Sequence, residues 1–518
     1  MDKFGKLALE ECNSEETMTR RGGVDGKPFW NTHATQFMYV PTFFFSPIWG
    51  VKEYIYSATD SKGDTYTFTA DNSSAPLTPI WKDLAYGIVE LKVEAVCEAT
   101  GRNYLAGARA FCKMEPFPGR SKLPPKARSY KECAIKAFRY VFEDEVYRYW
   151  LTHGVPKPDY FLNVYPSKTI SSIIKSMIAY AELEPENAEE AIKIATNAAD
   201  YLLSITYGED SHLPNVPPTY SFKGLDKAVV DANAPAAYGR RHQVMTIYPA
   251  FVGSAYLKLE EATGDKKYFD AALKIAEFYK NTVLENGSWY LLVSEQTGEH
   301  ESTNCCLEFS MLPFFADMYA RTGDECWHTI ERNYFEYIKK ESFDNYNWEA
   351  QFEDVRLTSS YYNLCHKNAD RMICYIAEEM SDNPEMMEQA KELMRFVEDQ
   401  FVVWTDYAPW CKWHYKEQKW YSPAALEQYL WYVPIDGSAV CIIRPLLKLY
   451  EATKNELYLE KAYALGDSMT RMQNPETGVI PTHWMTTDCS TVLYNFWINC
   501  HIGSAFIMLE LAKANGEL

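Results

Sequence analysis

The segment WEAQFED (348–354) carries three carboxylates close together, Glu349, Glu353 and Asp354, directly after Trp348. Hydrolysis of a glycosidic bond uses two carboxyl groups, one that protonates the leaving oxygen and one that acts as nucleophile or activates a water molecule. Burial beside an aromatic ring raises the pKa of one carboxyl, while a polar environment leaves another ionised. The sequence therefore predicts Glu349, Glu353 and Asp354 as the catalytic residues.

The same carboxylates also have a structural interpretation. They would cap the helix that follows or form ion pairs with nearby arginines. In an extended segment, Glu349 and Glu353 share one face and Asp354 lies on the other. Glu301 and Glu308, around the start of an earlier helix, are the reserve candidates.

A cationic run, Arg240-Arg241-His242, is the second constellation. An arginine side chain binds a carboxylate through two parallel hydrogen bonds, so this run suits a substrate that carries one. Lys168, which ends the segment YPSK (165–168), adds a further positive charge. Together these residues favour a uronic acid over a neutral sugar; the alternative interpretation is a helix start held by ion pairs.

Aromatic residues make up 15% of the chain, and many of them fall in the same segments as these charges. This aromatic content has two interpretations: a core rich in Tyr and Phe, or an aromatic-lined cleft that binds sugar rings. The further substrate-binding candidates are Tyr220, Tyr238, His300, Asn304, Trp348, Trp410, His414, His483 and Trp484.

The elements that must position these residues are helical from Ser129 onward, in an approximate repeat of helix, Gly, Asn or Asp turn, and second helix. Outer helices are predicted near 127–149, 188–205, 268–282, 325–339, 385–402 and 457–471. Inner helices are predicted near 167–182, 243–262, 303–322, 360–382, 433–453 and 492–514. Six such hairpins bury their apolar faces by closing into an (α/α)6 barrel, whereas an open solenoid would have short, regular loops throughout.

The predicted connections are of two kinds. Turns from an inner helix to the next outer helix are short. The long loops, from each outer helix to the next inner one, are 150–167, 206–242, 283–302, 340–359, 403–432 and 472–491. They share the rim at which the inner helices begin, and long loops on a rigid scaffold usually carry function. Helix N-termini that point toward a common axis favour an anion there.

Residues 27–120 cluster β-forming residues between turns and predict strands. We expect a small β-sandwich-like module, closed by the proline-rich segment 115–128. The predicted domains are a β-rich domain with its linker, 1–125, and a catalytic barrel, 126–518. The predicted fold class is therefore mainly α, an (α/α)6 six-hairpin barrel preceded by a small β domain.

Composition excludes several functions. A formal net charge of −20 without a Lys/Arg stripe argues against nucleic acid as a partner. No apolar stretch predicts a signal peptide or a membrane span. Thirteen cysteines without CxxC pairs or metal-ligand spacing indicate reduced thiols in a cytoplasmic protein. No metal and no cofactor are predicted, because nucleotide-binding glycine loops and the HExxH, GxSxG and EF-hand motifs are missing.

The β-rich module and the helical hairpins, together with YPSK (165–168), PPTY (217–220), WEAQFED (348–354) and RMQNPETGVIPTHW (471–484), resemble bacterial glycoside hydrolases of family 154. The resemblance covers most of the chain from about residue 35. It implies β-glucuronidase activity and a place in the six-hairpin glycosidase superfamily. That superfamily also contains unsaturated glucuronyl hydrolases, sugar epimerases and, on related toroids, polysaccharide lyases, so the fold alone does not choose the reaction.

The expected function is exo-acting hydrolysis that releases a terminal uronic acid from an oligosaccharide. The enzymatic alternative is a uronate lyase or a sugar epimerase, in which Tyr or His abstracts the C5 proton and Arg neutralises the carboxylate. The non-enzymatic alternative is a carbohydrate-binding scaffold. The sequence leaves open the aglycone, the stereochemistry and the oligomeric state, a homo-oligomer included.

Overall fold

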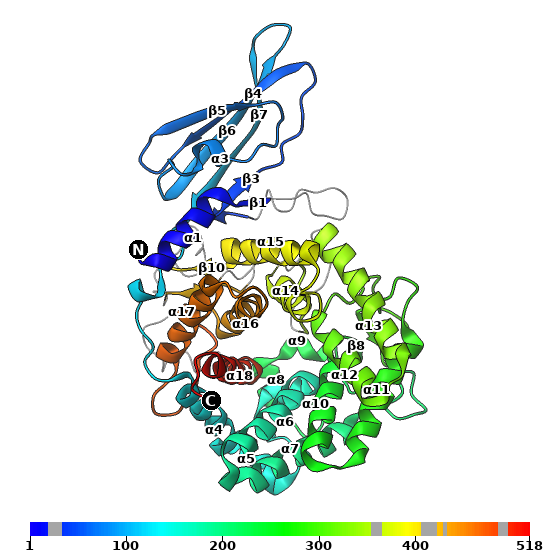
Figure 1. Ribbon diagram of the computed structural model, residues 1–518. Coiled ribbons are helices and arrows are strands. Elements are labelled where there is room, and N and C mark those ends of the chain that lie inside the picture. The colour runs from blue at the N-terminus through cyan, green and yellow to red at the C-terminus, as the bar shows by residue number, and fades with distance from the viewer. Residues whose placement is uncertain (19–33, 346, 354–364, 406–421, 428–432, 485–495) are drawn as a thin grey trace.

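The computed structural model describes residues 1–18, 34–345, 347–353, 365–405, 422–427, 433–484 and 496–518. Figure 1 shows a β-rich part, drawn in blue at the top, above a ring of helices that runs from cyan to red. The chain enters the ring after the β-rich part and ends inside it, at α18.

Outer and inner helices alternate along the chain, as the sequence pattern predicts. The outer helices are α4 (Tyr130–Glu143), α5 (Glu145–His153), α7 (Ala188–Ile205), α11 (Lys266–Thr282), α13 (Glu325–Ile338), α15 (Pro384–Phe401) and α17 (Glu456–Met472). The inner helices are α6 (Pro166–Leu183), α10 (Tyr248–Thr263), α12 (Leu312–Thr322), α14 (Lys367–Glu379), α16 (Asp436–Thr453) and α18 (Ile498–Ala514).

The ring is closed. Each inner helix packs against the outer helix that follows it, and the last inner helix, α18, packs against the first outer helix, α4. The inner helix α6 contacts both α10 and α18, and α16 contacts both α14 and α18. The short helix η5 (Phe309–Met311), which leads into α12, contacts α10 and α14. The predicted (α/α)6 toroid is therefore confirmed, and the open solenoid is excluded.

The two sets of helices begin differently. Helices α4, α11, α13, α15 and α17 each start at a Ser, Asp or Asn whose side chain accepts a hydrogen bond from the first turn. None of the six inner helices has such a side-chain cap, and Pro166, Pro249 and Pro313 stand in the first turns of α6, α10 and α12. Because these first turns lack a side-chain acceptor, their N–H groups favour negative charge at the rim.

The predicted difference in loop length is confirmed. Inner helices pass to outer helices through two to four residues, 184–187, 264–265, 323–324, 380–383 and 454–455. Gly264 and Gly323 end α10 and α12 in the left-handed region, with φ of 73° and 67°. The loops from outer to inner helices are far longer, and all of them gather at the inner-helix N-termini.

Some inner helices begin later than predicted because rim segments form short strands. Strand β8 (Gln243–Met245) pairs with β9 (Leu292–Ser294), so α10 begins at Tyr248 rather than at 243. Strand β10 (Val402–Val403) pairs with β11 (Ala424–Ala425) in another rim loop. The predicted helix starts at 360 and 492 fall outside the described residues.

The N-terminal part holds a five-stranded sheet in the order β2-β7-β6-β4-β5. Its strands are β2 (Gln36–Phe37), β4 (Val51–Thr59), β5 (Thr65–Ala70), β6 (Gly87–Cys97) and β7 (Asn103–Lys113). Neighbours are antiparallel except β2 with β7. On β6, Val89, Leu91, Val93 and Ala95 alternate with more exposed residues and face the core.

The β-rich character of this part is confirmed, but the prediction of a sandwich needs correction. Among the described residues one five-stranded sheet is present, and its buried side is covered by α3 (Thr78–Trp81), where Trp81 stacks on Phe111 at 6.0 Å. The additional strands β1 (Glu16–Met18) and β3 (Val40–Thr42) pair only with each other. An N-terminal helix, α1 (Lys3–Ser14), was not predicted. The domain boundary at 125/126 stays a prediction.

A buried charge network joins the N-terminal part to the barrel. Glu398, near the end of α15, receives hydrogen bonds from Lys461 Nζ at 2.7 Å and Tyr39 Oη at 2.8 Å on one oxygen. Trp404 Nε1 donates to its other oxygen at 2.9 Å. Lys461 and Glu398 are 1% and 3% exposed. Tyr39 precedes β3, so this carboxylate ties the β-rich part to α15 and α17.

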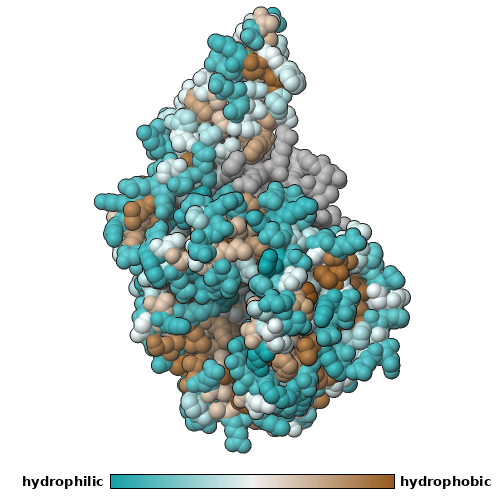
Figure 2. All heavy atoms as spheres, turned by 45° about the vertical axis from the view of Figure 1, so that its right-hand side comes forward, coloured by the Kyte–Doolittle hydropathy of each residue, from teal (hydrophilic) through white to brown (hydrophobic). Residues whose placement is uncertain are grey.

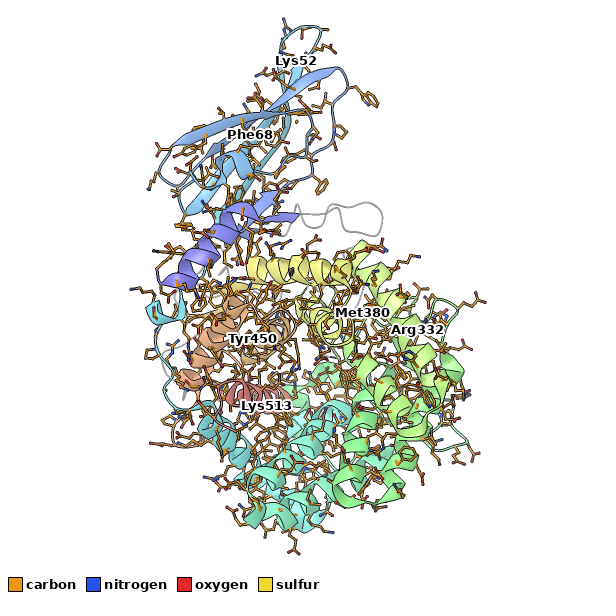
Figure 3. All side chains as sticks on the ribbon, viewed as in Figure 1. Lys52, Phe68, Arg332, Met380, Tyr450 and Lys513 are labelled. Atoms are coloured by element: carbon orange, nitrogen blue, oxygen red, sulfur yellow. The ribbon has the colours of Figure 1, made fainter. Side chains whose placement is uncertain are left out.

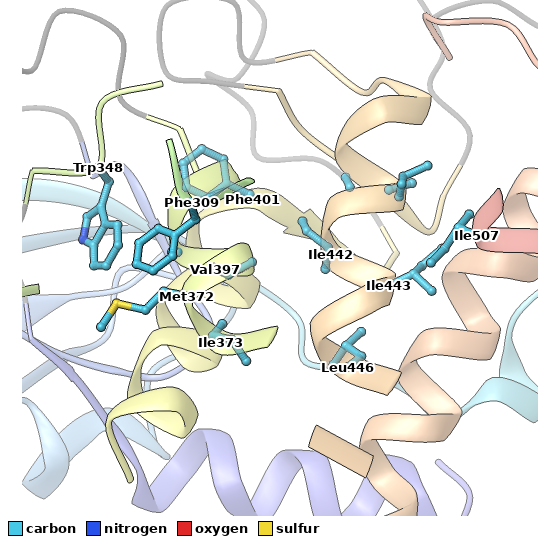
Figure 4. Packing of buried hydrophobic residues seen from close by; sticks show 14 of the residues in the cluster. Phe309, Trp348, Met372, Ile373, Val397, Phe401, Ile442, Ile443, Leu446 and Ile507 are labelled. Carbon is cyan, nitrogen blue, oxygen red and sulfur yellow. The ribbon is translucent and has the colours of Figure 1, made fainter. Parts of the chain in front are cut away.

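Hydrophobic side chains fill the space between the helices. Figure 3 shows side chains throughout the ring, and Figure 4 shows Trp348 beside Phe309 and Met372, with Ile442 and Leu446 of α16 across the interior. The face in Figure 2 is mostly hydrophilic, with small hydrophobic groups between polar areas. None of the described helices is long and apolar enough to cross a membrane.

We predict that Lys461→Met destabilises the protein strongly. Removing Lys461 leaves the Glu398 carboxylate buried without its counter-charge, which typically costs about 3–5 kcal/mol. The measurement is the free energy of unfolding in urea. Lys3→Met is the matched control, because Lys3 also joins the N-terminal part to α17, through Glu456 at 3.6 Å, but both side chains are exposed. We expect the control to change stability by less than about 1 kcal/mol; equal effects would contradict the assignment.

Candidate active site

The candidate active site lies where the inner helices begin. Side chains from the first turns of α6, α10 and α14 meet there with Glu308, just before η5, and with the loop that precedes α14. The site consists of three groups of residues: Glu353 with its partners, Glu308 with its partners, and the buried pair His366–Asp370.

Glu353 is the central side chain of the first group and is 1% exposed. Lys168 Nζ, on the first turn of α6, donates to its Oε1 at 2.6 Å, and Tyr248 Oη, at the start of α10, donates to its Oε2. The backbone oxygen of Glu353 accepts hydrogen bonds from Tyr220 Oη, at 2.7 Å, and from Arg240 Nη1. The fourth rim loop is thus fastened to the second loop and to two inner helices, α6 and α10.

These contacts set the charge of Glu353. Burial alone would raise its pKa, but the charge of Lys168 and the hydrogen bonds from Lys168 and Tyr248 lower the pKa below its usual value. Glu353 is therefore a carboxylate at neutral pH. Such a group suits a nucleophile or a base rather than a proton donor.

Glu308 forms the second group, just before η5. It is 1% exposed; Lys367 Nζ donates to Oε2 at 2.6 Å, and Ser310 Oγ donates to Oε1 at 2.6 Å. Arg371 Nη1 lies 3.6 Å from Oε1. Burial would raise the pKa of Glu308, but the charges of Lys367 and Arg371 outweigh it and lower the pKa to about 2. Glu308, a reserve candidate from the sequence, is thus a second ionised carboxylate at the inner ring.

The third group is the pair His366–Asp370 at the start of α14. His366 Nδ1 contacts Asp370 Oδ2, and both side chains are buried. His366 Nε2, Asp370 Oδ1 and Asn368 Oδ1 have no hydrogen-bond partner among the described residues. Burial raises the pKa of Asp370 to about 6, although the nearby His366 acts to lower it. This pair can hold or release a proton near neutral pH, in contrast to Glu353 and Glu308.

The two other predicted catalytic residues behave differently from Glu353. Glu349 is 3% exposed, and its backbone oxygen accepts a hydrogen bond from Asn368 Nδ2 at 2.9 Å, which ties it to α14. Asp354 lies outside the described residues. Trp348, predicted to stack on substrate, is fully buried and stacks on Phe396 at 6.1 Å. This prediction is corrected: Trp348 is a core residue, because its ring fills the space between α14 and α15.

The predicted carboxylate fork of Arg240 and Arg241 is also corrected. Arg240 Nη1 donates a hydrogen bond to the backbone oxygen of Glu353. The Nε of Arg241 donates to His242 Nε2 at 2.9 Å, in an exposed segment, and His242 Nδ1 lies 2.6 Å from Glu295 Oε1. Adjacent residues here point in different directions, so the run does not form one binding fork.

The aromatic and polar candidates of the second and third loops are dispersed. Tyr220 is buried and contacts Glu353, whereas Tyr238 stacks on Phe222 at 4.5 Å, away from that contact. His300 is exposed and stacks on Tyr290 at 3.9 Å. Asn304 is partly buried, and its backbone oxygen accepts a hydrogen bond from Leu291 N at 2.8 Å.

The last loops are only partly described. Trp484 is fully buried, and its Nε1 donates to Pro481 O at 3.2 Å, which corrects its assignment to the substrate surface. His483 is partly buried and its backbone pairs with Ile435. Trp410 and His414 lie outside the described residues.

Several residues of these groups were missed by sequence reasoning. Tyr248, Lys367, Arg371 and the pair His366–Asp370 lie inside the inner helices or at their starts, whereas most of the predicted site residues lie in the long loops. A signal was available: His366 and Asp370 are four residues apart, as are Lys367 and Arg371, so each pair shares one helix face.

No group of three or more His, Cys, Asp or Glu side chains in the described part of the chain is arranged to hold a metal ion. A surface groove of about 670 Å³ lies elsewhere, between residues 283–287 and the C-terminal half of α13, and is lined by Tyr337, Lys340 and Glu341 among others. It is separate from the three groups, and we assign the chemistry to the groups.

Comparisons with known proteins do not assign a family to this chain. No protein-family model and no curated protein matches the sequence. A family 76 glycoside hydrolase from a bovine Bacteroides thetaiotaomicron strain is 10% identical, with 89% of this chain and 93% of that chain covered and a TM-score of 0.47. The cellobiose 2-epimerase of Spirochaeta thermophila is 10% identical, with 74% and 98% covered and a TM-score of 0.48.

An unsaturated glucuronyl hydrolase from Streptococcus agalactiae is 12% identical, with 74% of this chain and 93% of that chain covered and a TM-score of 0.46. Likeness at this level does not assign a reaction. The resemblance to family 154 therefore stays a prediction, and the site must be argued from its own residues.

The lowered pKa of Glu308 predicts a pH-dependent contribution to stability. A carboxyl whose pKa falls from 4.5 to about 2 on folding contributes about 3 kcal/mol above pH 5, and this contribution is lost as the pH falls from 4.5 towards 2. The unfolding free energies of wild type and Glu308→Gln should therefore converge between pH 6 and pH 3. Glu301→Gln, at an exposed carboxylate, is the control and should show no such convergence. A pH-independent difference for Glu308→Gln would contradict the assigned charge.

Proposed function

We propose that the protein is a glycoside hydrolase that removes a terminal uronic acid from an oligosaccharide, with β-glucuronidase-like activity. One observation carries the proposal: carboxyl groups in two different protonation regimes lie at the start of the inner helices. Glu353 and Glu308 are held ionised by lysines, whereas burial raises the pKa of Asp370 to about 6. Glycosidases need this division between an ionised carboxylate and a proton donor.

In the proposed reaction, Glu353 is the ionised partner. Its Oε1 and Oε2 are oriented by Lys168 and Tyr248, so that a small movement of Lys168 frees a lone pair toward the sugar or toward a water molecule. The carboxyl of Glu349 or the pair His366–Asp370 supplies the proton to the leaving oxygen.

The charge at the rim supports an anionic sugar. Lys168 and Lys367 start two inner helices, and the six inner helices lack side-chain caps at their N-termini. Positive side chains and uncapped N–H groups favour the same kind of ligand group, a carboxylate. The substrate is thus a uronide rather than a neutral glycoside.

The pair His366–Asp370 favours a second candidate, a uronate lyase or sugar epimerase. A histidine oriented by a buried carboxyl is a common proton acceptor, and His366 Nε2 has no partner among the described residues. In that reaction His366 takes the C5 proton and a lysine or arginine neutralises the sugar carboxylate. A lyase forms a conjugated double bond that absorbs near 235 nm, as no hydrolase does.

The test is a screen of 4-nitrophenyl β-glucuronide and β-glucoside with wild type and Glu353→Gln. We expect turnover of the glucuronide only. Loss of the ionised carboxylate should lower kcat by at least about a hundredfold. Glu301→Gln, an exposed rim carboxylate, is the matched control and should stay within about threefold of wild type.

Circular dichroism and thermal unfolding verify that Glu353→Gln is folded. Activity confined to the glucoside would overturn the substrate class. A folded Glu353→Gln protein with wild-type turnover would overturn the role of Glu353. With an oligosaccharide whose uronic acid carries a sugar on O4, the C4–O bond breaks as the C5 proton is removed and that sugar leaves; product absorbance near 235 nm from this substrate would replace the hydrolase with the lyase.

A further inference from the structure

Three cationic side chains from the inner helices converge in the lumen of the barrel, below the rim. Lys175 lies on α6, seven residues after Lys168 and so about 10 Å deeper along the helix. Arg371 lies on α14, one turn below Lys367, and Arg444 lies on α16. In the inner ring, α6 and α14 stand opposite each other, with α10 and α12 between them on one side and α16 and α18 on the other.

The helix faces of Lys175 and Arg371 follow from their spacing. Lys175 lies on the same face of α6 as Lys168, and Arg371 lies on the same face of α14 as Lys367, and these two lysines bind Glu353 and Glu308. Burial, followed by the positive charges of Arg371 and Arg444, lowers the pKa of Lys175 to about 8. The charge of Lys175 on α6 is therefore repelled by the charges of Arg371 on α14 and Arg444 on α16.

The carboxylates of this region do not balance the positive charge. Arg444 is neutralised by Glu510, with Nη2 2.8 Å from Oε1. Lys367 and Arg371 share one carboxylate, that of Glu308.

Lys175 makes no hydrogen bond or ion pair among the described residues, and the buried Nε of Arg371 has no acceptor there. Lys175 is partly exposed and therefore open to a ligand, and a cation without an acidic partner favours an anionic one.

We propose that the barrel lumen holds an oxyanion-binding site formed by Lys175 and Arg371, with Arg444 adding to its positive potential. The ligand group is a carboxylate or a phosphate, which offers acceptors to both Lys175 Nζ and the free Nε of Arg371. The identity of the anion as a sugar carboxylate rests on the proposed function. In that case the terminal uronic acid enters the lumen with its carboxylate first and leaves its glycosidic bond at the level of Glu353.

The structure thereby moves recognition of the substrate charge from the second rim loop to the inner helices. Arg240 and Arg241, the candidates from the sequence, are engaged elsewhere. A site at the inner helices is more rigid than one on a loop, because each side chain is fixed by a helix that is packed on both sides.

The experiment is calorimetric titration of the whole protein with D-glucuronate, inorganic phosphate and D-glucose at constant ionic strength. We expect wild type to bind glucuronate, and Lys175→Met to bind it at least about tenfold more weakly, as for loss of one charge-assisted hydrogen bond. Glucose should not bind at this site. Competition by phosphate would show a general oxyanion site, and glucuronate binding without such competition would show a site for sugar carboxylates.

Lys448→Met is the matched control, since Lys448 lies one turn after Arg444 on α16 but pairs with Glu378 and Glu451. Its affinity for glucuronate should stay within about twofold of wild type. Thermal unfolding gives a second measure: removing an uncompensated cation should leave the Tm of Lys175→Met unchanged or higher, and added glucuronate should raise the Tm of wild type more than that of the variant.

The inference is overturned if neither anion binds wild type, if Lys175→Met binds glucuronate as wild type does, or if Lys448→Met loses as much affinity. Binding is measured without turnover. A protein that binds glucuronate through Lys175 but cleaves no uronide would therefore refute the proposed hydrolase and leave the oxyanion site in place.

Discussion

Closure of the helical ring is the constraint on which the rest of the structure depends. Each hairpin has an apolar face that it cannot bury alone, and the last inner helix, α18, must pack on α4 and α6 to cover the ends of the array. Closure makes six helix N-termini converge on one axis. The long loops then have a single place to meet, and the charges of the inner helices face a common lumen.

Convergence brings buried carboxylates into the same region, and each one needs a partner. Glu353 and Glu308 satisfy this requirement through Lys168 and Lys367, and their pKa values fall as a result. The same requirement fastens the N-terminal part to the barrel through Glu398 and Lys461. Lys175 departs from this pattern, because no acidic side chain lies among the charges that shift its pKa.

The sequence by itself determined the scaffold. Apolar periodicity, the N-cap residues of the outer helices and glycines such as Gly264 and Gly323 act within a few residues of chain, so they can be read in order. The alternation of outer and inner helices and the division between short and long connections followed from such local signals, although the first outer helix is divided into α4 and α5, and α10 and α12 begin later than predicted. The strands of the N-terminal part were also predicted, but the cover of their sheet was not, because Trp81 and Phe111 are thirty residues apart in sequence.

Only the tertiary structure decided which polar residues meet. Glu353 was among the predicted catalytic residues, yet its partner Lys168 is 185 positions away, and nothing local distinguishes that contact from a contact with Arg241. Trp348 and Trp484 share the composition of a sugar-binding loop but lie in the core. Lys175 and Arg371, on helices with no direct contact, face each other only because the ring is closed. Side-chain chemistry is local, whereas the juxtaposition of side chains depends on how distant segments pack.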